Sequence, residues 1–548
     1  MKKVRKNNYL VLVVVLIVVL LSGCGSKSSS PTPSTSDETK ETTGTGITNT
    51  VSSPAEMGIG DIMVIDFVDM EEAAFDFAGV DESSQFIMIV GSLSTSGQGS
   101  SIKLNSEGSI SVGEDIDPLV KSVVAGDDGY DASSILSSWL RAAEYELSTL
   151  DPIEPSVDKG MKSVMKSVGV GDTRDFRVLN SLSSLSNYTT ITAELKCIDS
   201  HVLLYVDQNA TSEMLDDDDI DYLCAEYERA TAFEYQLYGE PSDIDDNGKT
   251  IALITPQVNR LGGMAGGIIT GFFYAADLYS RTESNPVSNE GEVMYLMSPD
   301  PEGDFGYPIS HNFAINNLLS AVFPHELQHA ISYNQHVLVR GGSPESGWLN
   351  EGMSHFTEDL VGYNRENPSR FSLYLSGPEN VGVVAGSSPN LQERGAAYLF
   401  VRFLYEQSSD PEGFLRNLEQ SDLSGVDNLE QAFDGPENFS AFSELMARWT
   451  IALAMTDRGI SSDPRYTYRP RTVNSVTGNW DGVCMICEAE DGRSTELTGP
   501  HLNSLNGSSS ATVDGSAAKF YEITSVPDVI DLAATVSNGS YAVLIRTN

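Results

Sequence analysis

The stretch SAVFPHELQHAISY, residues 320–333, decides the fold and the chemistry that we predict for this chain. Residues four positions apart on an α-helix share a face, so His325 and His329 can both direct an imidazole nitrogen at one metal ion. A catalytic zinc site has three protein ligands and leaves a fourth position to water. Glu326 would lie beside that zinc-bound water and take its proton as general base. We therefore predict a helix that carries two zinc ligands and a catalytic carboxylate.

Two alternatives stay open for this stretch. Pro324 precedes the motif, and proline cannot lie undisturbed inside a helix because it lacks a backbone N–H. The helix therefore either begins at Pro324 or runs from about His311 and kinks there. The other alternative to a zinc site is a pair of solvent-exposed histidines. The chain has only seven histidines, so we expect the motif by chance in fewer than roughly one such sequence per hundred.

The third zinc ligand distinguishes the classes of zinc peptidase. His336 suggests a metzincin, but that pattern requires glycine three residues after the second histidine and another histidine three residues later. Ser332 and Gln335 stand at those two positions, so the metzincin pattern fails.

A second helix is predicted over WLNEGMSHFTED, residues 348–359. Its helical spacing places Glu351, His355 and Glu358 on one face. Glu351 is our predicted third ligand.

HELQH followed by WLNEG resembles the gluzincins, in which the glutamate of an Asn-Glu pair completes the zinc site. Together with the preceding NEGEVMYL and the continuation MSHFTEDL, the strings resemble most the hyicolysin family of bacterial zinc metalloendopeptidases, over about residues 195–460. The resemblance implies a zincin-like domain with a mixed sheet, an active-site helix and a following helical subdomain. It also implies cleavage of proteins or peptides, with His325, His329 and Glu351 binding zinc and Glu326 as the catalyst.

The chain departs from the thermolysin-like pattern at His355, where those enzymes place an acid that orients a ligand histidine. Three outcomes stay open: Glu358 or Asp359 takes that role, His355 assists the oxyanion, or His355 only packs. An oxyanion stabiliser is also needed. Tyr398 is our candidate, because RGAAYLF resembles a helix that commonly follows this pair of motifs.

Two stretches before the motif concern the substrate cleft. EGEVMYLMSP, residues 290–299, is predicted to form the edge strand above the cleft, where an extended peptide can add as a further strand. The alternative is an ordinary edge strand. The glycine-rich residues 261–280 lack the surroundings of a phosphate-binding fingerprint and are predicted to form a loop.

The first residues predict an exported protein. Residues 1–23 begin with basic side chains, and their apolar run Tyr9–Leu21 is shorter than the about 20 residues that a membrane-spanning helix needs. They are therefore predicted to be a signal peptide. Small residues before Cys24 resemble a bacterial lipobox, which implies lipidation of Cys24 and anchoring to the cell envelope. An uncleaved membrane anchor is the alternative.

The segment after the anchor also bears on location. If the cell has two membranes, Gly25 favours the outer one, by resemblance to bacterial sorting rules. Residues 24–55 are rich in Ser, Thr and Pro and predict a flexible tether. We therefore expect the rest of the chain to lie outside the cytoplasm, held at the membrane through the N-terminal lipid.

The 548 residues are enough for two to four domains, and we predict an α+β fold. Residues 56–194 show short apolar runs typical of a β-rich accessory region, interrupted by one helical pattern at residues 133–147. Residues 195–460 are the predicted peptidase domain. Strand patterns return in residues 461–548, which we predict to form a β-sandwich-like domain.

The acidic composition excludes one class of function. The formal net charge is −45, and nucleic-acid binding requires basic surface, so we predict no nucleic-acid partner. One acidic run, Asp216–Asp219, directly precedes a helical pattern. It is predicted to cap the N-terminus of that helix.

A second acidic segment resembles the start of a calcium loop. Asp243, Asp245 and Asn247 have the D-x-D-x-N-G spacing, which makes Ca²⁺ a possible second cofactor beside Zn²⁺. An EF-hand would need glutamate at the twelfth position, where Ile254 stands. A tight turn without calcium is the alternative.

The cysteines beyond Cys24 number four: Cys197, Cys224, Cys484 and Cys487. An even number suits two disulfides in an oxidising compartment. Cys484 and Cys487 have the spacing of a zinc knuckle, but no second such pair exists, so a local disulfide is predicted.

The function predicted from the sequence is thus a secreted, membrane-anchored zinc endopeptidase. An adhesin-like surface lipoprotein with a vestigial zinc site is the alternative from another class; it would require Glu326 to be idle. A zinc aminopeptidase is suggested by WLNEG. The 21 residues between His329 and Glu351 exceed the aminopeptidase spacing, and no string typical of an amine-binding site precedes the motif.

Overall fold

We describe the fold from a computed structural model of the chain. The structure describes residues 44–67, 72–95, 99–106, 132–150, 168–264, 266–386, 389–435, 441–490, 494–505, 509–524, 529–535 and 539–548. The predicted signal peptide, Cys24 and the first part of the predicted tether lie outside these residues. Among the described helices, none has the length and apolar character needed to cross a membrane.

A six-stranded mixed sheet forms the scaffold beside the HELQH motif. Its strands, in spatial order, are β5 (Thr173–Leu179), β6 (Tyr188–Ile198), β7 (Val202–Asp207), β8 (Thr250–Ile254), β10 (Val293–Leu296) and β9 (Gly271–Phe273). β7, β8 and β10 run parallel, whereas β5, β6 and β9 pair antiparallel with their neighbours. The three parallel strands are buried at every position, which explains their continuous apolar sequences.

The edge of this sheet differs from the prediction. β10, within the stretch expected to be the edge strand, lies between β8 and β9, and β9 forms the edge. The glycine-rich residues 261–280 therefore include an edge strand as well as the end of helix α3 (Pro256–Met264). Three residues of strand in a glycine-rich setting are too short for a period-two pattern to reveal.

Helix α2 (Asp217–Leu237) packs against β6 and β7. Its start confirms the predicted cap, because the Asp216 side chain accepts a hydrogen bond from the backbone N–H of Asp219. A disulfide between Cys197 and Cys224 joins β6 to α2. The local Cys484–Cys487 disulfide is present as predicted.

The motif helix is part of a longer helical segment that begins at His311. It consists of the short helix α4 (His311–Phe313), a π-helical segment at 314–319, helix α5 (Ser320–Tyr333) and a second π-helical segment at 334–339. Pro324 lies inside α5, so of the two alternatives the longer helix is the one observed.

A bundle of helices follows α5 in the chain. Its members are α6 (Gly347–Leu360), α7 (Asn367–Leu375), α8 (Leu391–Gln407), α9 (Pro411–Glu419), α10 (Gly425–Ala432) and α11 (Phe442–Met455). α6 packs on both α5 and α8. Gly352 allows the close approach to α8, because a Cβ there would lie 3.1 Å from Ala397 Cβ. Two small hairpins come next, β11 (Thr472–Val473) with β12 (Trp480–Asp481) and β13 (Ile486–Glu488) with β14 (Glu496–Thr498).

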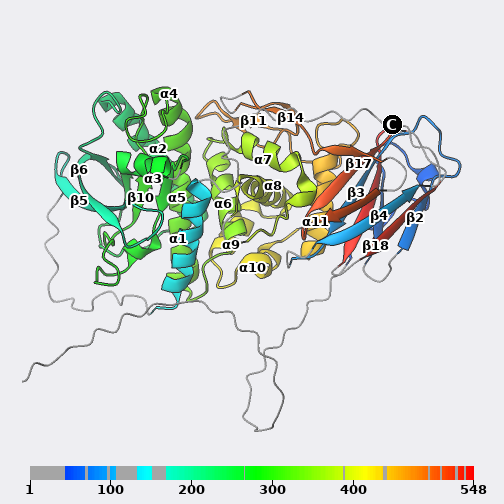
Figure 1. The fold of residues 1–548 in the computed structure, drawn as a ribbon, viewed down its shortest axis with the longest axis horizontal. Helices are drawn as coiled ribbons and strands as arrows, with labels where there is room; N and C mark the ends of the chain where they lie inside the picture. The colour runs from blue at the N-terminus through cyan, green and yellow to red at the C-terminus, as the bar shows by residue number, and fades with distance from the viewer. Residues whose placement is uncertain are drawn as a thin grey trace, which may run out of the picture. The chain divides into compact units, whose positions relative to one another are not determined.

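A β-sandwich is built from both ends of the described chain. One sheet has the order β1 (Ile62–Asp66), β19 (Ser540–Arg546), β3 (Phe86–Ser92), β17 (Ala518–Ile523), β15 (Leu502–Ser504). The other has the order β16 (Ser509–Val513), β4 (Ser100–Ser106), β18 (Val529–Thr535), β2 (Glu72–Asp76). Figure 1 shows the blue N-terminal strands β2 and β4 beside the red C-terminal strand β18.

This pairing differs from the expectation of separate β-rich domains at residues 56–194 and 461–548. The strand patterns were correct, but a strand pattern does not identify the partner strand, and here the partners lie at the opposite end of the chain. In addition, β5 and most of β6 belong to the sheet beside the motif helix, so that unit extends to about residue 173, before the predicted boundary at 195. The mixed α and β content agrees with the predicted α+β class.

The first sandwich sheet is covered on both faces. Met88 and Leu544 point into the sandwich core, whereas Ile89 and Val543 belong to the large core shared with the helices. On that second face β3 packs against α11, and the hydroxyls of Thr450 and Tyr541 are hydrogen-bonded at 2.7 Å. The sandwich is therefore joined to the helical bundle through apolar packing.

Candidate active site

Helices α5 and α6 bring the three predicted zinc ligands together. His325 Nε2 lies 3.5 Å from Glu351 Oε2, and His329 Nε2 lies 3.8 Å from Glu351 Oε1. The two histidines come from one face of α5, as their spacing of four residues predicted, and Glu351 comes from the first half of α6. All three side chains are buried.

The donor set fits a zinc ion. Among the described residues, His325, His329 and Glu351 each offer a donor atom within 4.8 Å of the others. Glu351 Oε2 is buried and accepts no hydrogen bond, although Arg394 Nη1 lies 3.3 Å away. Two imidazole nitrogens and one carboxylate are ligands of catalytic zinc sites, and an unsatisfied buried carboxylate oxygen favours a cation beside it.

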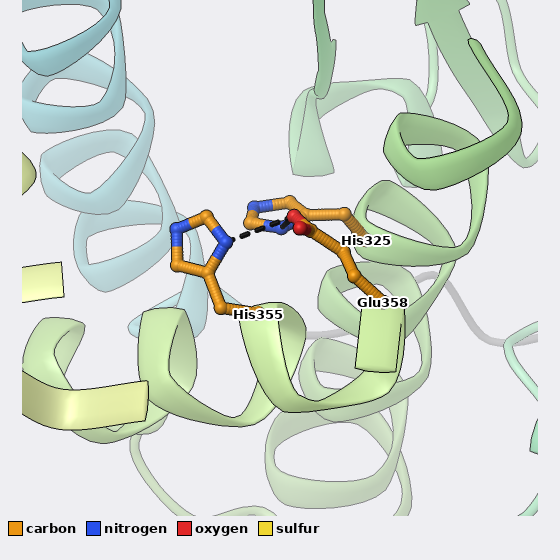
Figure 2. Close-up of side chains that lie close together, drawn as sticks. All are labelled: His325, His355 and Glu358. Carbon is orange, nitrogen blue, oxygen red and sulfur yellow. Dashed lines mark hydrogen bonds and ion pairs between the residues drawn. The ribbon is translucent and has the colours of Figure 1, made fainter. Parts of the chain in front are cut away.

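Glu358 contacts His325, the first of the predicted ligand histidines. Figure 2 shows His325 and His355 approaching the same carboxylate, with Nδ1 to Glu358 Oε1 distances of 2.9 and 2.8 Å. Burial by itself would raise the pKa of Glu358, but His355 and Arg370 outweigh burial and hold the pKa well below its usual value. Each Nδ1–H donates to this anion, so the Nε2 atom of His325 is free to face Glu351.

The group His325, His355 and Glu358 could itself hold a metal by the same distance measure. Its short nitrogen-to-oxygen distances are those of hydrogen bonds, so we interpret it as the orienting network of His325. His355 Nε2 is buried, has no hydrogen-bond partner, and lies 4.0 Å from Glu351 Oε2. Of the outcomes left open, the contact of His325 with Glu358 fits the first, and a part for His355 at the oxyanion stays a prediction.

His329 has an orienting partner on α6. Its Nδ1 lies 3.1 Å from Asn350 Oδ1, and Asn350 directly precedes Glu351. Asn350 and Glu351 thus reach the cluster from adjacent positions of α6, the amide oxygen beside His329 and the carboxylate beside both histidines.

Glu326 is held against the edge strand. Its Oε2 accepts a hydrogen bond of 2.8 Å from the backbone N–H of Phe273, the last residue of β9. Burial is the largest influence and raises the pKa of Glu326; Glu351 adds to the rise, while His325 and Arg141 oppose it. A carboxylate with a raised pKa is a stronger base, which suits the role predicted for Glu326.

Two predicted residues lie in a different network. The Tyr398 hydroxyl is fully buried and donates to Asp359 Oδ2 at 2.8 Å, and Arg402 Nη1 lies 2.7 Å from the same oxygen. Asp359 Oδ1 accepts from the backbone N–H of Gly482. Asp359 therefore does not orient a ligand histidine here, and the Tyr398 hydroxyl is not available to a substrate in this arrangement.

One contact with the cluster was not predicted from the sequence, namely that of a helix in the N-terminal region. Helix α1 (Ala132–Ser148) brings Ser137 Oγ to 3.0 Å from Glu351 Oε1, where it donates a hydrogen bond. Arg141 Nη1 lies 3.3 Å from His329 Nδ1, and Arg141 Nη2 lies 2.9 Å from Glu144 Oε1. The helix itself was predicted. The signal for its location was the row of polar residues Ser137, Arg141 and Glu144 along its buried face.

The predicted calcium residues form a turn outside this cluster. The Asn247 amide donates to Asp245 Oδ2 at 2.7 Å, and its oxygen accepts from Lys249 N–H at 2.6 Å. Asp243 and Asp245 instead lie close to Glu292, a residue that the sequence analysis did not connect with them.

Comparison with known proteins points to one class of enzyme. No protein-family model matches the chain. A curated relative, the neutral metalloprotease ShpI of Staphylococcus hyicus, is 25% identical over 234 residues, which are 40% of this chain and 49% of the relative. The match supports a metallopeptidase. The chain spans about half the length of this relative, so the match shows a likeness to a metalloprotease and no more. Zinc is the metal that the buried His and Glu donors favour.

Proposed function

We propose that the chain is a secreted, lipid-anchored zinc endopeptidase that hydrolyses peptide bonds within proteins. One observation carries the proposal. Two imidazole nitrogens and a carboxylate converge from α5 and α6, and Glu326, one residue after the first histidine, is held in place by the edge strand β9. A vestigial site in an adhesin would not need a positioned base.

Each residue of the cluster has a defined part in hydrolysis. His325, His329 and Glu351 would hold the zinc ion, while Glu358 and Asn350 fix the orientation of the two imidazoles. A zinc ion bound there supplies a Lewis acid that makes a water molecule more acidic and polarises a peptide carbonyl. Glu326 takes the proton from the attacking water and delivers it to the leaving amine.

The edge strand accounts for cleavage within a chain. Among the strands that the structure describes, β9 pairs with β10 alone, and its last residue, Phe273, donates its N–H to Glu326. A peptide that adds to this edge as a further strand would run past Glu326 in extended form. Such binding uses backbone groups on both sides of the scissile bond and needs no free amino end, which favours endopeptidase over aminopeptidase action.

The location outside the cytoplasm is part of the proposal. It is supported by the signal-like residues 1–23 and by the lipobox-like sequence before Cys24. The two disulfides agree with an oxidising compartment. The lipid would tether the enzyme to the envelope, at the outer membrane where two membranes exist.

Cleavage of unfolded casein and of an end-blocked peptide by the full chain tests the proposal, with and without a zinc chelator. We expect Glu326→Gln to lower the rate by about 10²- to 10⁴-fold while zinc content and melting temperature stay near those of the wild type. Glu283→Gln, at an exposed glutamate, is the matched control. Unchanged cleavage by Glu326→Gln contradicts the mechanism, and cleavage restricted to peptides with a free amino end favours an aminopeptidase.

A further inference from the structure

A second carboxylate cluster lies at the end of the sheet where β8 and β10 begin. Asp243 and Asp245 precede β8, Glu292 directly precedes β10, and the three offer oxygen atoms within 4.8 Å of one another. The turn is closed from within: Asp243 Oδ1 accepts from the N–H groups of Asn247 and Gly248 at 2.9 and 3.0 Å. Gly248 has φ of +68°, which a residue with a side chain rarely adopts.

Glu292 provides an independent indication of a ligand. The side chain is 1% exposed; its Oε1 accepts from Ser242 Oγ and from the N–H of Ile244, but its Oε2 is buried without a hydrogen-bond partner. A buried carboxylate oxygen left unpaired is costly unless a cation lies beside it. Burial raises the pKa of Glu292 to about 7, and it also raises the pKa of Asp245.

We propose that Asp243, Asp245 and Glu292 form a Ca²⁺ site. All three donors are oxygens, so a hard cation is favoured over zinc, which prefers nitrogen and sulfur. Calcium takes six to eight oxygen ligands, so other oxygens would complete the coordination around the three carboxylates. Glu292 supplies, from a distant point in the sequence, the acidic ligand that an EF-hand takes from its twelfth position. Bound calcium would clamp the starts of β8 and β10 together.

Calcium binding is tested on the full chain by titration with CaCl₂ and, in parallel, MgCl₂, with thermal unfolding and calorimetry as readouts. We expect calcium to raise the melting temperature of the wild type, and Glu292→Gln to weaken binding by at least about tenfold. Asp243→Asn is the second variant, because its exposed side chain carries little folding risk. Asp246→Asn removes the same charge from the same turn outside the cluster and should bind calcium like the wild type.

Two results would contradict the proposed calcium site. The first is a wild-type melting temperature that does not change with calcium. The second is equal calcium affinity in Glu292→Gln and Asp246→Asn, because the charge of the turn and not the cluster would then explain binding.

A second inference concerns helix α1 and rests on the proposed function. Figure 1 shows α1, in cyan, beside the sheet unit and the helical bundle, and its contacts reach both: it packs on α3 and on the turn 275–278, and Ser137 bonds Glu351 on α6. With α1 in place, His325 and Glu326 are each only 7% exposed. α1 contacts the cluster directly, through Ser137 to Glu351 and Arg141 to His329, so a substrate carbonyl that reached the same residues would have to displace these contacts.

Arg141 opposes metal binding in two ways. Ligation through Nε2 of His329 requires the ring proton on Nδ1, where it donates to Asn350. An Arg141 N–H directed at the same Nδ1 favours the opposite tautomer, with the proton on Nε2. The guanidinium also places a positive charge beside the ligands of a divalent cation. The Nε of Arg141 is buried without a hydrogen-bond partner, so this polar group is left unsatisfied while α1 packs against the cluster.

We infer that α1 is an internal inhibitory helix that must leave the cleft before the cluster can act. The test compares Arg141→Ala and Ser137→Ala with Tyr145→Ala, a change on the exposed side of the same helix. The two readouts are hydrolysis of an end-blocked peptide and the rate at which a colorimetric chelator removes zinc from the loaded full chain. We expect Arg141→Ala to raise both by at least about fivefold, with Ser137→Ala in the same direction and Tyr145→Ala unchanged.

The two readouts separate this inference from the proposed function. A lower peptidase rate in Arg141→Ala with unchanged zinc release overturns it, because Arg141 would then serve the working site. Zinc release equal to that of Tyr145→Ala overturns it as well. If no form of the chain cleaves peptides, the proposed function fails, while faster zinc release from Arg141→Ala still shows that α1 shields the cluster.

Discussion

The zinc-type cluster and the β-sandwich are assembled from very different distances along the chain. The cluster and its orienting residue lie within the 33 positions that separate His325 from Glu358, on α5 and α6. The sandwich depends on pairs such as Ile62 with Ile545, from β1 and β19. Helix periodicity places the residues of the first on shared faces, whereas the second requires strands from opposite ends of the described chain to pair. The stability of the sandwich and the chemistry of the cluster should therefore be separable by mutation.

The largest effect that tests this separation is expected from Leu544→Ala. Leu544 is fully buried in the sandwich core, so its truncation should lower the free energy of unfolding by about 2–5 kcal/mol. Urea unfolding measures that loss, and chelator competition measures zinc affinity of the folded fraction, which we expect to stay unchanged. Ile59→Ala, at a position 60% exposed, is the control. A parallel loss of zinc affinity would show that the two regions are coupled, through the packing of β3 on α11.

Removing the orienting carboxylate should have a smaller effect, confined to the cluster. Glu358→Ala leaves the Nδ1 atoms of His325 and His355 without their acceptor, and we expect zinc affinity to fall by about 10- to 100-fold. Glu358→Gln keeps an acceptor and should fall between this variant and the wild type. Chelator competition gives the affinities.

Asp359→Asn is the informative neighbour of Glu358. It removes a carboxylate that contacts Tyr398 and Arg402 and no ligand histidine, so zinc affinity should be kept even where stability drops. If Asp359→Asn lost as much zinc affinity as Glu358→Ala, Glu358 would not be the specific partner of His325 that we propose.

The sequence predicts the zinc-type cluster better than it predicts the pairing of strands in the β-sandwich. The spacing of His325, Glu326 and His329 and the face shared by Glu351 and Glu358 are consequences of helix geometry, so their grouping was predictable. The Asp216 cap was predictable because it is a local feature, and two disulfides were predictable because the number of cysteines is even. The edge strand was not predictable, because the three residues of β9 are too few to show a period-two pattern. The longer apolar strand β10 was predicted to be the edge instead.

Long-range partners were beyond the sequence for a physical reason. The strands in residues 56–106 are marked by short apolar runs, but an apolar run does not show which strand lies alongside. The same holds for α1, whose Ser137 and Arg141 meet residues 214 and 188 positions away. Glu292 likewise joins Asp243 and Asp245 only because β8 and β10 are neighbours in the sheet.

The smallest effect we expect concerns the pH dependence of stability, which should come from the catalytic half. The sandwich core is made of apolar side chains, whereas beneath α5 Glu419 is buried, accepts from Gln328 Nε2 at 2.5 Å, and has its pKa raised to about 8, first by burial and then by Glu345. Glu234, also buried, adds a second carboxyl whose pKa burial and Glu419 raise.

The sign of the pH dependence follows from proton binding. An unfolded glutamate releases its proton near pH 4.3, so between about pH 4.3 and about pH 8 the folded state binds the additional proton, and the free energy of unfolding falls as pH rises. Glu419→Gln is neutral at every pH and keeps an acceptor for Gln328, so its free energy of unfolding should decline less steeply over that window. Urea unfolding at about pH 5 and about pH 8 measures the difference, with the exposed Glu302→Gln as control. Parallel pH profiles for Glu419→Gln and the wild type would mean that Glu419 does not hold its proton in the folded state.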